Sequence, residues 1–106
     1  MTAYGPLQSS LNAATAAGAG TVVDLGVQTD EFLLYYTVTG TGSANFKVEA
    51  SLDNVNWFTL FNSGNVSAGG VSSQVPSGYA GRYFQATLNS VSGSPVVTAA
   101  IAAAVC

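Results

Sequence analysis

The stretch from Asn45 to Leu60, NFKVEASLDNVNWFTL, constrains the fold more than any other part of the chain. From Phe46 onward, apolar and polar side chains alternate, which is typical of a strand with one face in a core and one in water. The expected buried face carries Phe46, Val48, Ala50 and Leu52, and the other face carries Lys47, Glu49 and Ser51. Asp53–Asn56 predicts a tight turn, because Asn and Asp bond to their own backbone and tolerate left-handed angles. A second strand is expected over 57–61.

Further strands are expected elsewhere, separated by turn-forming residues. They cover 21–25, 31–39, 66–76, 82–88 and 96–105, with turns at 40–43 and 89–95. Because large side chains occur on both faces of 31–39, this segment is predicted to be a central strand of the sheet. The glycines and Pro76 place 66–76 at a sheet edge, as two short pieces or an ordered loop.

The alanine-rich segment 96–105 is compatible with a short helix, but its β-branched residues and Pro95 favour a strand. About seven short strands without a convincing helix predict an all-β fold. We expect an antiparallel, jelly-roll-like β-sandwich, with a small barrel as the alternative.

The first twenty residues, Met1–Gly20, contain no charged side chain and differ in this from the remainder of the chain. Ser10 could cap one or two helical turns over 10–17. We expect an N-terminal arm over 1–20 and a sandwich domain over 21–106. The arm is either a frayed terminus or a strap that orders on a neighbouring subunit. The candidate subunit-contact residues are Tyr4, Leu7 and Leu11.

Charge is scarce throughout the chain of 106 residues, which has the length of one domain. Charged residues make up 7%, against about 25% in typical domains. Lys47 and Arg82 are the only basic residues, which disfavours direct binding to nucleic acid or to an anionic membrane. A surface of Ser, Thr, Asn and Gly has few ionic groups to desolvate and suits close contact with other protein.

Residues for chemistry are equally scarce. The chain has no histidine, the commonest general base and metal ligand. Asp30 and Glu31 are adjacent, so on a strand they point to opposite faces and form no working pair. We expect no catalytic residue, no metal site and no cofactor. Cys106 allows no internal disulfide and is either an unreactive thiol or an intermolecular link.

Aromatic residues are the remaining candidates for binding. Trp57 and Tyr79 are the candidate surface aromatics, able to stack on a sugar or to contact protein. The alternative is that Trp57 and Tyr83 pack inside the sandwich. Arg82 is expected to stack on Tyr83 or to pair with Asp53 or Glu49.

The N-terminus carries no Lys or Arg, so no signal peptide is expected. The apolar segment 96–105 is shorter than the ~20 residues of a membrane span. Synthesis and folding in the cytoplasm are expected.

Two stretches resemble parts of known modules. VEASLDNVNW, Val48–Trp57, and the later RYFQATL resemble discoidin-like β-sandwich modules, in which a strand leads into S-x-D-G-x-x-W and a later strand begins R-Y. Here Asn54 stands where those modules have glycine. This resemblance covers about half of the chain and implies a fold, not a ligand.

The whole chain resembles small phage virion proteins of the head-decoration or minor-capsid type. The likeness rests on the uncharged start and on strands rich in Thr, Ser, Gly and Ala. It implies a non-enzymatic, homo-oligomeric protein of the virion that stabilises the shell by contacts with the major capsid protein or another virion protein. The alternative is a carbohydrate-binding β-sandwich module, which a virion could display.

Overall fold

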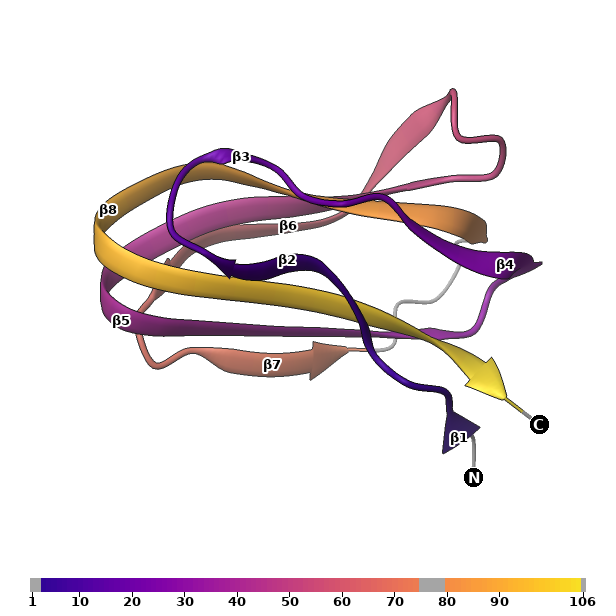
Figure 1. The fold of residues 1–106 in the computed structure, drawn as a ribbon, viewed down its shortest axis with the longest axis horizontal. Helices are drawn as coiled ribbons and strands as arrows, with labels where there is room; N and C mark the ends of the chain where they lie inside the picture. The colour runs from indigo at the N-terminus through magenta and orange to yellow at the C-terminus, as the bar shows by residue number, and fades with distance from the viewer. Residues whose placement is uncertain (1–2, 75–79, 106) are drawn as a thin grey trace.

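The fold is built from strands joined by turns and loops in the described residues, 3–74 and 80–105 of a computed structural model (Figure 1). The strands are β1 (Ala3–Tyr4), β2 (Gln8–Ala14), β3 (Gly18–Ala19), β4 (Val23–Thr29), β5 (Phe32–Ser51), β6 (Trp57–Ser67), β7 (Val71–Gln74) and β8 (Gly81–Val105). Every pair of neighbouring strands is antiparallel. The predicted all-β, antiparallel fold is therefore confirmed.

The two longest strands, β5 and β8, form the centre of the sheet. They pair along the whole of β5, from Phe32 opposite Ala103 to Ser51 opposite Tyr83. Both strands bend where Gly42 lies opposite Gly93, and the paired ribbon turns back at the left of Figure 1. The sheet therefore folds over into two layers that share the same two strands.

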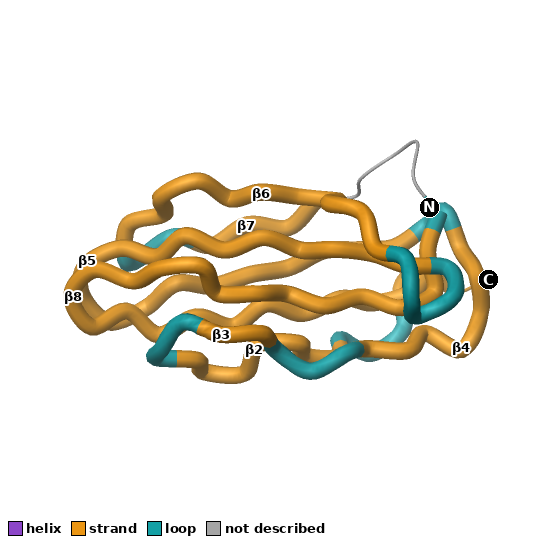
Figure 2. The backbone as a smooth tube through the Cα atoms, turned by 90° about the horizontal axis from the view of Figure 1, so that it is seen from above, coloured by secondary structure: helices purple, strands orange, loops and turns teal. Residues whose placement is uncertain are grey.

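Shorter strands extend both edges of this ribbon. β6 pairs with the second half of β5, and β7 pairs with its first half. On the other edge, β1, β2, β3 and β4 follow one another along β8. The result is a sandwich-like body in which each layer contains half of β5, half of β8 and the short strands beside them (Figure 2).

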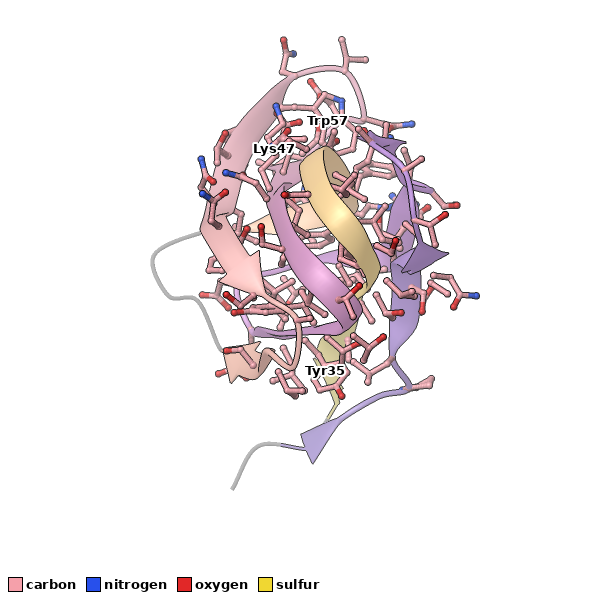
Figure 3. The ribbon with its side chains drawn as sticks, turned by 90° about the vertical axis from the view of Figure 1, so that its left-hand side faces the viewer. Tyr35, Lys47 and Trp57 are labelled. Carbon is pink, nitrogen blue, oxygen red and sulfur yellow. The ribbon has the colours of Figure 1, made fainter. Side chains whose placement is uncertain are left out.

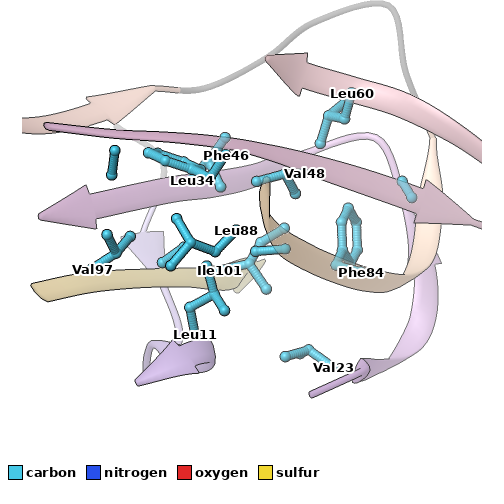
Figure 4. Close-up of a cluster of buried hydrophobic side chains, with 14 of the residues drawn as sticks. Leu11, Val23, Leu34, Phe46, Val48, Leu60, Phe84, Leu88, Val97 and Ile101 are labelled. Atoms are coloured by element: carbon cyan, nitrogen blue, oxygen red, sulfur yellow. The ribbon is translucent and has the colours of Figure 1, made fainter. Parts of the chain in front are cut away.

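The core lies between the two layers. Phe32 and Phe84 come from opposite layers, and their ring centroids are 5.0 Å apart. Tyr36 meets Phe46 edge-on across the same gap, at 4.9 Å. Figure 4 shows aliphatic side chains filling the space around them. Each fully buried large apolar side chain contributes about 1.5–3 kcal/mol to stability, so face-to-face packing holds the folded ribbon closed.

The predicted alternation of buried and exposed side chains is confirmed along β5. It fails at Leu52, where the chain enters the turn between β5 and β6. Phe46, Val48 and Ala50 are buried as expected, whereas Leu52 is 46% exposed; Ser51 shares the outer face with Lys47 and Glu49, as expected, but is fully buried there. β5 ends at Ser51, so the alternation does not extend to Leu52. The Ser51 hydroxyl instead accepts a hydrogen bond from the backbone N–H of Asn54 at 2.9 Å, and this bond helps to close the turn.

The segments 40–43 and 89–95 are not the turns that the sequence predicts. They are the bends of β5 and β8, and they stay paired with each other. Gly42 has a φ of +96°, and a Cβ there would overlap the carbonyl oxygen of Ser92. Glycine in a strand often marks a bend or a close approach of backbones, and here it does both. Merging the strands on either side explains why β5 and β8 are so long.

Other strand predictions are confirmed. Segment 96–105 is the end of β8 rather than a helix, and 66–74 contains two β pieces on either side of Gly69-Gly70, while Val75 and Pro76 lie outside the described residues. β7 lies beside β5 at an edge of the sheet.

Residues 3–20 contribute three strands to the sheet, β1, β2 and β3, which corrects the expectation of an arm over 1–20 ahead of a domain that begins at residue 21. β2 replaces the expected helical turns over 10–17. Leu11 is 4% exposed and lies in the chain's own core. The Ser10 hydroxyl donates to the carbonyl oxygen of Thr21 at 2.6 Å and accepts from the N–H of Ala86 at 2.8 Å. The edge of β8 supplies the hydrogen-bonding groups that order this segment.

Leu11 and Leu7 provide a matched test of this correction. Leu11→Ala should lower the free energy of unfolding by about 2–5 kcal/mol, because it leaves a cavity in the core. Leu7→Ala should cost less than about 1 kcal/mol, since Leu7 is 47% exposed. Urea unfolding followed by tryptophan fluorescence measures both values. Equal small losses would show that β2 is not packed on the core.

Candidate functional site

The interior offers little room for a ligand. The gap beside Ser10, Leu34 and Ala86 has a volume of about 10 Å³, room for one water molecule at most. Within the described part of the chain, no three His, Cys, Asp or Glu side chains lie close enough together to hold a metal ion. The search for a site therefore turns to the outer faces of the two layers.

One outer face carries a row of four side chains across four strands. Ser51 of β5 lies opposite both Trp57 of β6 and Tyr83 of β8, and Tyr83 lies opposite Asp24 of β4. Residues directly opposite each other on paired strands project from the same face. The next residue of β8, Phe84, points into the core, so the row points outward. Trp57 and Tyr83 are both half-buried there.

Arg82 holds one end of this row in place. Its Nε donates to Oδ1 of Asp24 at 2.8 Å and its terminal nitrogen donates to Oδ2 at 3.1 Å. The guanidinium carbon also lies 5.0 Å from the centre of the Tyr83 ring. The predicted stacking on Tyr83 is confirmed, whereas the predicted partners Asp53 and Glu49 are wrong. The register of β4 on β8 brings Asp24 beside Tyr83 instead.

The same interaction shifts both ionisable groups. The hydrogen bonds from Arg82, followed by one from the N–H of Gly26, hold the pKa of the Asp24 carboxyl below its ordinary value. The carboxylate in turn raises the pKa of Arg82. Both groups are therefore fully charged near neutral pH, and they neutralise each other.

A second ion pair lies on the same face. Lys47 Nζ is 3.4 Å from Oε1 of Glu49, two residues along β5. We call the surface formed by Trp57, Tyr83, Arg82, Asp24, Lys47 and Glu49 the aromatic face. In Figure 3, Trp57 and Lys47 lie at one end of the view, and Tyr35 lies at the opposite end. Four of the chain's seven charged side chains are thus gathered here as two neutral pairs.

The predicted site residues have different positions. Trp57 belongs to the aromatic face, and Tyr79 lies outside the described residues. Leu7 is exposed and Leu11 is buried, while the main chain of Tyr4 pairs with Ala104. Leu11 therefore cannot take part in the expected contact surface.

The expected turn at Asp53–Asn56, which joins β5 to β6 as a hairpin, is confirmed. Several hydrogen bonds within the turn hold it in place. Oδ1 of Asp53 accepts from the N–H groups of Val55 and Asn56 at 2.9 and 2.8 Å, and from the Ser51 hydroxyl at 3.0 Å. Asn54 has a φ of +62°, where asparagine replaces the glycine of the resembling modules at little cost. These hydrogen bonds, led by that of Asn56, lower the pKa of Asp53 far below its ordinary value.

Comparison with known proteins adds no identification. No protein-family model matches the chain, and no curated protein or solved structure matches it either. The described residues contain no helix that could cross a membrane.

Asp53 should make stability depend on pH in a defined direction. Its pKa is lower in the folded state than the ordinary value of 3.8, so its contribution is complete above that value and is lost as the pH falls through the folded-state pKa. Asp53→Asn should melt at a lower temperature than the wild type near pH 7. The difference should shrink toward pH 2, as measured by thermal unfolding across that range.

Asp30→Asn is the control, because Asp30 is exposed and forms no hydrogen bond with any described residue. If it changed the pH profile as much as Asp53→Asn, the turn would not be the source of the effect.

Proposed function

We propose that the protein is a non-enzymatic structural protein of a phage particle, of the capsid-decoration or minor-capsid type, which stabilises the shell through protein contacts. The observation that carries this proposal is the scarcity of charge, since only three charged side chains, Asp30, Glu31 and Asp53, remain outside an ion pair. Of seven charged side chains, four form the ion pairs Asp24–Arg82 and Lys47–Glu49 on one face. Burying an unpaired ionic group is costly, so a surface with few of them can be covered by another protein at low cost.

The turn between β5 and β6, residues 52–56, which we call the hairpin tip, offers a contact element in which Asp53 is the single ionic group and its carboxylate is hydrogen-bonded within the turn. Val55, inside the turn that Asp53 holds, is 75% exposed, and Leu52, just before it, is 46% exposed. Beside them, a shallow hollow is lined by Leu52, Asp53, Asn56 and Phe58. A turn that is rigid before binding loses little conformational freedom on binding, which favours affinity. This tip therefore replaces the N-terminal segment as the proposed point of attachment.

The size of the molecule fits attachment as one of many copies. A standard interface covers roughly 800 Å² on each partner, about a seventh of the 5337 Å² that this chain exposes. Modest contacts of that size become strong when symmetry repeats them around a shell or an oligomer. The mechanism requires no catalytic group, in keeping with a chain that has no histidine.

The test uses phage particles that lack this protein. They are produced in the host by a phage from which the gene for the protein has been deleted. Purified protein added back should bind to them at a fixed number of copies, measured by sedimentation and mass spectrometry. Val55→Asp should reduce occupancy about tenfold or more, as expected for loss of a central apolar contact.

Thr15→Asp is the matched control, because it adds the same charge at an exposed position between β2 and β3, at the opposite end of the molecule (Figure 1). It should leave binding unchanged. Failure of the wild-type protein to sediment with any particle would overturn the proposal.

A further inference from the structure

We infer that the aromatic face binds a neutral oligosaccharide chain. This inference does not rest on the proposed role in a particle, since a glycan-binding face could serve a free protein equally well. It rests on the geometry of Trp57 and Tyr83, on the polar groups beside them, and on the charge balance of the face.

The two rings are placed to contact separate sugars of one chain. Trp57 and Tyr83 stand in one row with Ser51 between them, so their backbones are two strand spacings, roughly 10 Å, apart. Ser51 is fully buried and small, which leaves the two larger side chains as the prominent groups of the row. Aromatic rings offer a large, rigid apolar surface, to which the C–H face of a pyranose ring is complementary.

Polar groups next to the rings are already oriented. Two residues along the strands from Ser51 and Tyr83, Glu49 of β5 lies opposite Gln85 of β8. The Gln85 amide donates to the carbonyl oxygen of Gly20 at 2.9 Å, and Glu49 is held by Lys47 at 3.4 Å. These amide, carboxylate and ammonium groups can donate to and accept from sugar hydroxyls. Because they are fixed on strands, they lose little freedom when a ligand binds.

The charge balance selects a neutral ligand. Lys47 and Arg82 are the only basic side chains of the whole sequence, and both are paired with carboxylates on this face. A sulfated, phosphorylated or uronic-acid-rich chain, like a nucleic acid, needs cations that are free to neutralise it. A neutral glycan needs none.

The outer face of the other layer provides the contrast. Tyr35 is half-buried there, opposite Ala100 of β8. Its neighbours on β5, Leu33 and Thr37, also carry no charge. Among these described side chains no second aromatic or charged group stands beside Tyr35, which makes it a matched tyrosine outside the aromatic face (Figure 3).

The experiment is affinity electrophoresis and calorimetry of the full chain with a panel of glycans. The neutral members are hydroxyethyl cellulose, xylan, mannan, dextran and chitin oligosaccharides, and the acidic members are heparin and alginate. At least one neutral glycan should bind. Trp57→Ala and Tyr83→Ala should each weaken that binding about tenfold or more, as expected for aromatic residues central to an interface. Tyr35→Ala should leave it unchanged.

Folding is checked by the far-ultraviolet circular dichroism and melting temperature of each variant. Trp57→Phe keeps an aromatic ring and should retain part of the affinity if an alanine variant is unstable. Binding to no neutral glycan, binding to heparin or alginate alone, or an equal loss with Tyr35→Ala would each overturn the inference.

Discussion

The antiparallel pairing of β5 with β8 is the interaction on which the rest of the structure depends. It runs from Phe32 opposite Ala103 to Ser51 opposite Tyr83, through a bend shared by both strands and a one-residue register shift after Asn45. Because the ribbon folds over, its own inner face becomes both sides of the core, and Phe32 meets Phe84 there. Every other strand adds to an edge of this ribbon. The chain thereby obtains two layers without a disulfide.

Local sequence patterns predicted local structure well. They failed where contacts with segments distant in the sequence determine the conformation. The hairpin turn was predictable because Asp53 and Asn54 form it with their near neighbours. The segment 40–43 has the composition of a turn, and only its pairing with β8 makes it a bend. Leu11 carries no signal of its own and is buried because β8 offers an unpaired edge beside it.

The candidate site shows the same limit. The sequence identified Trp57 and the stacking of Arg82 on Tyr83, both of which depend on residue type and adjacency. It could not place Tyr83 in line with Trp57, because that alignment follows from the register of three strands. It also missed Asp24 as the partner of Arg82. The same folded ribbon thus presents two surfaces, a hairpin tip with exposed Leu52 and Val55 and a neutral aromatic face, on one sheet.

Alanine substitution at Gly42, compared with Gly69, tests the continuous, bent ribbon most directly. The two glycines have φ values of +96° and +95°, so alanine costs about 1–2 kcal/mol of backbone strain at either. Only at Gly42 would the added methyl group overlap the opposite strand, at Ser92, while nothing lies within 4 Å at Gly69. Urea unfolding should show Gly42→Ala to be less stable than Gly69→Ala by about 1–3 kcal/mol. Equal stability of the two variants would contradict a ribbon that remains paired through its bend.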